Sequence, residues 1–329
     1  MNQAQFEARH DQEWREFEAW LKALRSKKSD VVGVNARLWP HRYRAMAHHL
    51  TLARDRAYSP ELVERLQHLA LGGHQALYGS RGNALNAVIE FVGSGFPALV
   101  RRESTTVLVA IALLFVPLLG LIAILQRWPE FIHYLVDPDQ LASYEAMYAP
   151  ANRALGPQHA AESQVMMFGY YVWNNVKIDF QCFAGGIAFG LGSIFFMLFN
   201  GMMIGAVAGH LTQLGLVQTF WGFVAGHSSW ELLGAAISGA AGLKLGWALV
   251  APGPLTRMAA LRQSARPAVR LLYGAAAMTT CAAFIEAFWS SLRSIPPEIK
   301  YAVGIFFWGV FLVYFLFAGH KRDGAAHAD

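Results

Sequence analysis

Six apolar runs beyond residue 104 constrain the fold of this chain more than any other feature of its sequence. A helix needs about 20 mainly apolar residues to cross a hydrocarbon core about 30 Å thick, because it rises about 1.5 Å per residue. All but one of the runs approach that length. We therefore predict six membrane crossings, at 105–125, 183–203, 211–225, 230–250, 271–289 and 301–317.

The first 104 residues differ in composition from the rest. The whole chain is 55% apolar and 15% charged, which is typical of a membrane protein. Residues 1–104 nevertheless hold most of the charged residues and contain no apolar run longer than a few residues. The expected fold class is therefore all-α, with a soluble helical domain at 1–104 and a polytopic transmembrane helical bundle at 105–329.

Helical spacing is visible inside the soluble domain. A single apolar stripe at intervals of three, four or eight residues is formed by Phe6, Trp14, Phe17, Leu21 and Leu24. The SPE sequence at 59–61 is typical of a helix start, and we expect Gly72 and Gly73 to weaken or end that helix. Residues 84–104 are predicted to form an interfacial segment that leads into the first crossing.

The third apolar run, 211–225, is short for a full crossing and contains Thr212, Gln213 and Gln218. It either crosses the membrane or forms half of a re-entrant hairpin whose turn lies at 226–229. Both alternatives return the chain to the same side of the membrane.

The orientation is predicted from the short connections. Residues 251–270 contain four arginines and no acidic residue, whereas acidic residues dominate 126–182. Basic connections stay in the cytoplasm. We therefore expect a multi-pass protein of the bacterial inner (cytoplasmic) membrane, with both termini in the cytoplasm and the aromatic stretch 168–175 as an outer interfacial anchor.

Small residues recur every fourth position in two runs, which places them on one helix face in each. Such stripes allow close approach of another helix in lipid, so we predict helix packing at Gly201, Gly205, Gly209, Gly234, Ser238, Gly242 and Gly246.

Polar residues from three segments are expected at one level near the outer side of the membrane. His227 and Glu231 are four residues apart, at the outer end of their helix, and Glu286 comes near the outer end of the fifth run. Asn174, Asn175 and Asp179 come just before the second run. Intramembrane ionisable groups usually face other helices or water, so the six residues predict one polar cluster.

Two interpretations of this cluster remain open at this point, a hydrogen-bonded knot between helices and a cavity that binds an ion, a lipid headgroup or a solute. A catalytic metal site is a third. The His-x-x-x-Glu pattern supplies at most two ligands, and no HExxH, phosphate loop or dinucleotide fingerprint is present. The sequence therefore indicates no metal, no cofactor and no catalytic residue.

The sequence "VWNNVKIDFQCFAGGIAFGLGSIFFMLFNGMMIGAV", followed by "GHSSWELLGAAISGAAGLKLGWAL", resembles the membrane core of the stage II sporulation protein M family. The resemblance covers about 166–250 and, more loosely, the chain from residue 105. It implies a polytopic scaffold, which in sporulating bacteria assembles with cell-wall hydrolases at the engulfing membrane. The long N-terminal domain, with "LYGSRG" at 77–82, resembles the non-sporulating bacterial branch, for which only the scaffold-like membrane core is implied.

The expected function is that of a non-enzymatic inner-membrane scaffold that couples cytoplasmic and cell-envelope partners. The alternative is a transporter, channel or lipid-handling membrane protein that uses the polar cluster near His227 and Glu231. Expected partners are membrane lipids, envelope and cytoplasmic proteins and a second copy of the chain. No nucleic-acid motif is present, and the net charge of +5 suits anionic lipid headgroups.

Overall fold

A computed structural model of the protein describes residues 1–25, 39–77, 84–151 and 164–320. Within these ranges the regular structure is helical, and no strand occurs, which confirms the predicted all-α class. The chain divides into two compact units, Met1–Val88 and Ile89–Asp329, and each is described by itself. Of the LYGSRG segment, only Leu77 falls within the described residues.

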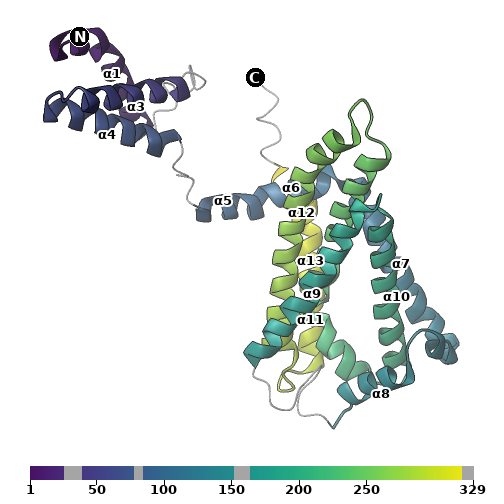
Figure 1. Cartoon of the computed structure of the whole chain (residues 1–329). Helices are drawn as coiled ribbons and strands as arrows, with labels where there is room; N and C mark the ends of the chain where they lie inside the picture. The colour runs from purple at the N-terminus through teal and green to yellow at the C-terminus, as the bar shows by residue number, and fades with distance from the viewer. Residues whose placement is uncertain (26–38, 78–83, 152–163, 321–329) are drawn as a thin grey trace. The chain divides into compact units, whose positions relative to one another are not determined.

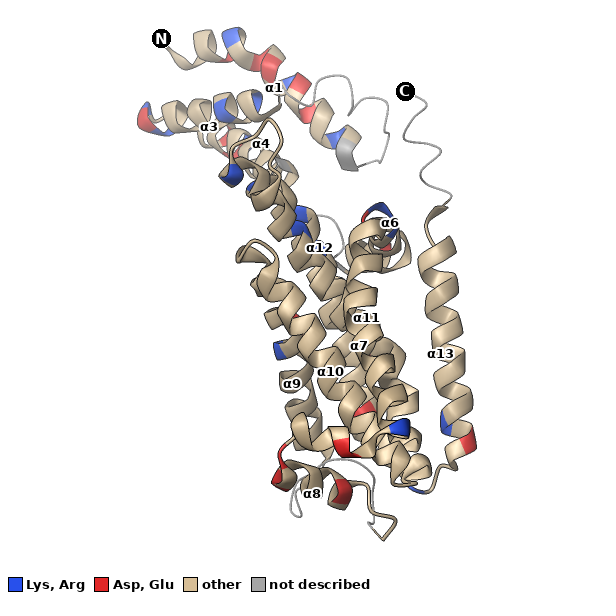
Figure 2. Cartoon of the chain, turned by 90° about the vertical axis from the view of Figure 1, so that its right-hand side faces the viewer, with Lys and Arg blue, Asp and Glu red and all other residues tan. Residues whose placement is uncertain are grey.

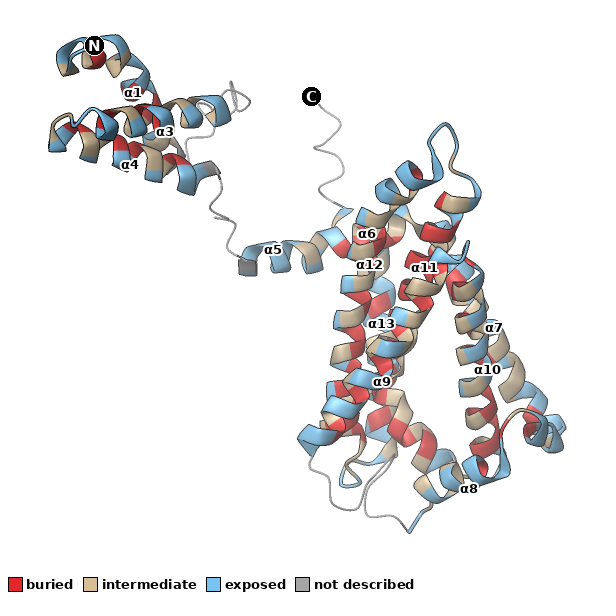
Figure 3. Cartoon of the chain, viewed as in Figure 1, coloured by how far each residue is buried: buried red, intermediate tan, exposed pale blue. Residues whose placement is uncertain are grey.

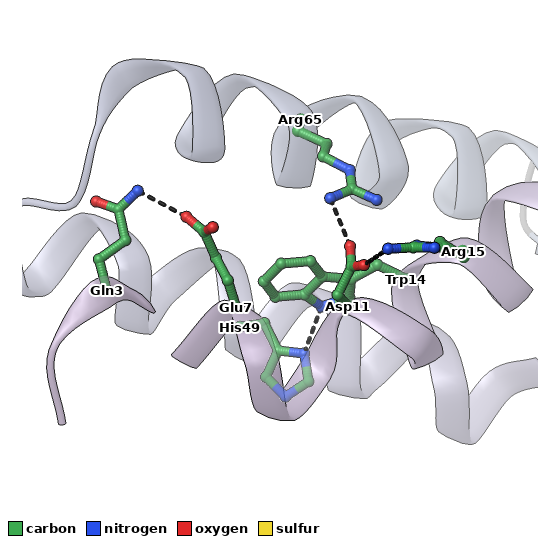
Figure 4. Close-up of polar contacts among 7 residues, drawn as sticks. All are labelled: Gln3, Glu7, Asp11, Trp14, Arg15, His49 and Arg65. Atoms are coloured by element: carbon green, nitrogen blue, oxygen red, sulfur yellow. Dashed lines mark hydrogen bonds and ion pairs between the residues drawn. The ribbon is translucent and has the colours of Figure 1, made fainter. Parts of the chain in front are cut away.

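The first unit is built on α1 (Gln3–Arg25), α3 (Trp39–Asp55) and α4 (Pro60–Leu77). The predicted stripe forms its core, since the side chains of Phe6, Trp14 and Phe17 are fully buried. Polar contacts lie around this core (Figure 4), among them the ion pair between Arg65 Nη1 and Asp11 Oδ1 at 2.8 Å.

The glycine pair in α4 does not end the helix, which continues to Leu77. Gly72 lies against the Leu21 side chain, and Gly73 lies against the rings of Phe17 and Tyr43. The two glycines therefore allow α4 to pack closely against its neighbours, because a larger side chain would collide with them.

The second unit is a bundle of long helices with shorter helical segments at its ends (Figure 1). Helix α5 (Ala84–Glu90) spans the boundary between the two units. After it, in chain order, come η1 (Phe91–Gly95), α6 (Phe96–Arg102), α7 (Ser104–Arg127), η2 (Pro129–Tyr134), α8 (Pro138–Met147), α9 (Gln164–Ala184), η3 (Gly185–Ile187), α10 (Leu191–Gln213), α11 (Val217–Val250), α12 (Arg257–Ile285), η4 (Glu286–Ser290) and α13 (Pro297–Phe317). Buried residues lie mainly on the inward sides of α11 and α12 (Figure 3).

Five helices among the described residues are long and apolar enough to cross a membrane. They are α7, α10, α11, α12 extended by η4, and α13. The predicted polytopic membrane bundle is therefore confirmed.

The bundle has two ends that can be told apart by their contacts. At the α6 end, Arg101 Nη1 donates to Phe315 O at 3.0 Å, and Lys244 Nζ donates to Glu103 Oε2 at 2.7 Å. At the α8 end, Arg293 Nη1 donates to Pro150 O at 2.6 Å. Figure 2 shows Lys and Arg on α6 and at the start of α12, and Asp and Glu gathered around α8.

A sixth helix, α9, passes between these ends although it is not one of the five apolar helices. Near its start, Tyr171 packs in one cluster with Tyr148 and Phe220 at the α8 end. Near its finish, Cys182 O accepts a hydrogen bond from Ser193 Oγ, at the beginning of α10. The polar run 174–179 lowers the apolar content of α9 without removing it from the bundle.

The predicted third crossing is wrong. Run 211–225 contains the end of α10, a turn at 214–216 and the first turns of α11. The re-entrant hairpin is also wrong, because residues 226–229 lie inside the continuous 34-residue helix α11. The turn uses Gly215, whose φ of +79° is readily adopted only by glycine.

The predicted second crossing, 183–203, is displaced. Its first residues end α9 and form η3, and α10 begins only at Leu191 after Gly190, which has a φ of +84°. This break packs against α11, since Gly186 lies against the Gly242 backbone. Asn174, Asn175 and Asp179 consequently lie inside a bundle helix, and not before a crossing as predicted.

The small residues predicted for packing face neighbouring segments. Gly201 and Gly205 leave no room for a Cβ against the α7 backbone at Leu114 and Leu118, and Gly209 faces Ile122 and Leu125. On α11, Gly234 faces Thr279, Gly242 faces Cys182 and Ser193, and Gly246 faces Gly190, while Ser238 is fully buried. The α11 positions thus face two different neighbours, α12 and the α9–α10 break.

Candidate functional site

A buried polar cluster lies where α11 meets η4 and α9. His227 and Glu231 of α11 and Glu286 of η4 each offer one potential ligand atom, and these atoms all lie within 4.8 Å of one another. His227 and Glu286 are buried, whereas 28% of the Glu231 side chain is exposed. The structure therefore brings together the three ionisable residues that the sequence singled out.

The spacing of the two α11 residues places both on one helix face, as their separation of four requires. Their position along the helix differs from the prediction, which placed them at its outer end. Helix α11 begins at Val217, ten residues before His227, so the pair lies well inside the helix.

The helix α12 changes to a π-helical turn where it reaches the cluster. Glu286 and Ser290 are the first and last residues of this turn, and both face the α11 histidine. Gly226 lies directly against the Trp289 ring, so α11 can approach η4 only because a Cβ is absent there. Single π-turns within α-helices are frequent at functional sites.

His227 is held on both sides of its ring. Its Nδ1 lies 3.0 Å from Ser290 Oγ, within hydrogen-bond distance, and its ring packs edge-on against Phe223. Its Nε2 is 3.8 Å from Glu231 Oε2, which is too far for a hydrogen bond. The imidazole is therefore oriented by Ser290 and turns its other nitrogen toward the carboxylates.

Of the three α9 residues predicted to join the cluster, only Asn175 lies beside it. Asn174 is exposed and donates from Nδ2 to Asn175 Oδ1 at 3.1 Å. Asn175 is buried with its amide directed at the Glu286 carboxylate, although Nδ2 completes no hydrogen bond of good geometry among the described residues. Asp179 is fully buried one turn further on, where its Oδ2 accepts from Thr279 Oγ1 at 2.8 Å.

Three contributing residues were not found from the sequence. Ser290 and Thr279 are single hydroxyls in apolar surroundings and give no pattern to recognise. The buried Lys300 of α13 donates from Nζ to Ser290 O and to Leu292 O, at 2.7 Å each. Lys300 thereby satisfies backbone carbonyls at the end of the π-turn. The one sequence signal for it is a lysine in the first turn of an apolar helix.

Taken together, the fold and the cluster define a multi-pass α-helical membrane protein with an imidazole and two carboxylates enclosed between its helices. The chain belongs to the stage II sporulation protein M family, whose family model matches residues 101–291. The matched range runs from α6 to just beyond η4, so it includes every residue of the cluster.

The first unit has a separate match. Residues 4–79 match a domain of unknown function (DUF8413), a range that covers α1, α3 and α4. No curated protein and no solved structure matches the chain.

Proposed function

We propose that the protein is a scaffold of the bacterial inner membrane that couples a cytoplasmic partner to a partner in the cell envelope. The observation that supports this most is the two-part construction of the chain. A soluble helical unit and a membrane unit each have their own apolar core, and each matches its own family model. A chain built in this way can hold a soluble partner at one side of a membrane.

The orientation that the proposal needs is supported by charge. The α6 end carries Arg101 and Arg102, and α12 begins there with four arginines in its first four turns, whereas α8 begins with acidic residues. Because basic segments are retained in the cytoplasm, we place the α6 end and both termini inside. The α8 end then faces the envelope.

Site-specific photo-crosslinking in native membranes tests the proposal. A photoreactive residue at the exposed Glu64 of α4 should give adducts with a cytoplasmic protein, and one at the exposed Gln140 of α8 should give adducts with an envelope protein. The same residue at Leu312, exposed on α13, serves as the control and should label lipid alone. Absence of protein adducts at both Glu64 and Gln140 would contradict a coupling role.

A second candidate function, the movement of an ion or a lipid-derived solute, is favoured by one observation. The bundle encloses two carboxylates that pair with no Lys or Arg among the described residues. The Glu231→Gln variant separates the candidates, since it retains size and hydrogen bonding but removes a charge. We expect the crosslinks at Glu64 and Gln140 to survive in this variant. Their loss in a correctly inserted protein would contradict a scaffold that is independent of the cluster.

A further inference from the structure

We propose that His227, Glu231 and Glu286 form an intramembrane binding site for a divalent transition-metal ion of the Zn²⁺ or Mn²⁺ class. The proposal rests on their geometry. Ligand atoms about 2.0–2.2 Å from one ion lie roughly 3–4.4 Å apart, depending on the angle between them. The 3.8 Å between His227 Nε2 and Glu231 Oε2 falls inside this interval, although it is too long for a hydrogen bond.

The third ligand atom fits the same arrangement. All three atoms lie within 4.8 Å of one another, so a side-chain movement of roughly half an ångström brings them around one centre. They come from α11 and from the π-turn, and a site held by two helices is more rigid than a site on a loop.

Ser290 prepares the histidine for metal binding. A metal-binding imidazole usually donates a hydrogen bond from its other nitrogen, which fixes the tautomer and the ring orientation. Ser290 Oγ, 3.0 Å from His227 Nδ1, can accept that hydrogen bond. The lone pair is then on Nε2, the nitrogen that faces Glu231.

Asn175 provides a second and independent observation. Its side chain is buried with the amide directed at the Glu286 carboxylate, although Nδ2 completes no hydrogen bond of good geometry among the described residues. A buried donor with so weak a hydrogen bond is unfavourable, and the contact is completed if Glu286 is held as a carboxylate with one oxygen on an ion and the other on this amide.

Charge balance also favours a cation. Two carboxylates this close in a low-dielectric interior cannot both remain ionised unless a cation compensates them, and among the described residues neither is paired with Lys or Arg. Lys300, the buried cation nearby, donates to backbone carbonyls instead. A bound divalent ion would neutralise both carboxylates at once.

A similar group in the first unit lacks these properties. His10, Glu13 and His49 also lie within 4.8 Å of one another, but Trp14 Nε1 donates to His49 Nδ1 at 3.1 Å (Figure 4). An indole can only donate, so it occupies the His49 lone pair and leaves the proton on Nε2. Glu13 is 58% exposed. We therefore assign no ion to that group.

The ligand set narrows the kind of ion. One imidazole and two carboxylates, without a thiolate, suit Zn²⁺, Mn²⁺, Fe²⁺ or Co²⁺, whereas Mg²⁺ and Ca²⁺ prefer oxygen ligands alone. Three protein ligands leave a further coordination position open.

Titration of the purified full-length protein in detergent with Co²⁺, followed by its visible absorption, tests the proposal. We expect one saturable site that Zn²⁺ competes for. Glu231→Gln and Glu286→Gln should each weaken binding at least about tenfold, and Ser290→Ala by about 10- to 100-fold, because loss of an outer partner of a ligand has that effect. His210→Gln is the matched control, since His210 also contacts a glutamate, Glu145, at 2.8 Å but has no third ligand beside it within the described ranges.

X-ray absorption of the Zn²⁺-loaded wild-type protein does not depend on how the variants fold. One imidazole, oxygen ligands and no sulfur are expected. The proposal is overturned if the wild type shows no saturable Co²⁺ site, if both glutamine variants bind as the wild type does, or if the ion is coordinated by sulfur or by water alone. Because metal binding is measured on the purified protein, these outcomes are independent of whether a scaffold partner is found.

Discussion

At the scale of single residues, hydrogen-bond partners decide what each buried histidine can do. His49 accepts a hydrogen bond from the Trp14 indole, and His227 contacts the Ser290 hydroxyl. The first partner can only donate, and the second can also accept. Both histidines lie beside glutamates, but only His227 has a ring nitrogen whose lone pair is available to a ligand. The role of His49 is structural.

The His49 partner leads to a prediction about pH. Burial, and then the nearby His10, lowers the pKa of His49 to about 4 from its usual 6.5. Between pH 6.5 and 4 the unfolded domain therefore binds a proton that the folded domain excludes, so stability is full above pH 6.5 and falls as the pH decreases.

Urea unfolding of a fragment of residues 1–79 at pH 7.5 and pH 5 checks this. We expect the free energy of unfolding to fall by about 2 kcal/mol. The His49→Gln variant should lose most of this dependence, and the variant at the exposed His68, His68→Gln, should keep it. Equal pH dependence in both variants would show that His49 is not the group responsible.

At the scale of helices, glycine determines how closely the elements of the membrane unit approach one another. Gly242 of α11 lies against the backbone oxygens of Cys182 and Phe183, whereas Gly120 of α7 has no described atom within 4 Å of the position of an added Cβ. The same substitution should therefore have opposite effects at the two positions.

We expect Gly242→Ala to lower the thermal unfolding temperature in detergent by several degrees, because overpacking costs about 1–3 kcal/mol. Gly120→Ala should leave it unchanged or raise it slightly, since alanine is the better helix former by about 1 kcal/mol. A stable Gly242→Ala variant would mean that α11 does not approach the α9–α10 break as closely as described.

The helices that follow apolar runs could be predicted, and those that break the pattern could not. Runs 105–125, 271–289 and 301–317 correspond to α7, α12 with η4, and α13. Helix α9 was missed as a bundle helix because its polar residues, including the buried Asp179, satisfy partners that only the folded bundle supplies. The turn at 214–216 was missed because its single glycine stands among apolar residues.

In the candidate site, too, some contacts could be predicted from the sequence and others could not. The spacing of His227 and Glu231 predicted a shared face, and their charge predicted a meeting with Glu286. The role of Ser290 depends on the π-turn, which changes the direction of side chains after Glu286 and has no signature in the sequence. Only the hairpin alternative gave Gly226 a role, as part of a turn, whereas it accommodates the Trp289 ring.

At the scale of the whole molecule, six of the described helices pass between the ends of the membrane unit, so α7 begins and α13 finishes at the same α6 end. The proposed orientation predicts a labelling pattern. In a background that lacks Cys182 and Cys281, an impermeant thiol reagent should modify a cysteine at the exposed Ser143 in intact spheroplasts. It should miss one at the exposed Gln263 until the membrane is opened. The reverse labelling pattern would show that the protein has the opposite orientation in the membrane.

The length of α11 has a consequence for how the protein meets bilayers of different thickness. Its 34 residues span roughly 50 Å, against a hydrocarbon core of about 30 Å, so the helix must lean or project. When a helix changes its tilt, its ends move most along the membrane normal and its centre moves least. The centre of α11 lies between residues 233 and 234, within three positions of Glu231. Thinning or thickening of the surrounding lipid would therefore move both ends of α11 while leaving Glu231 at nearly constant depth.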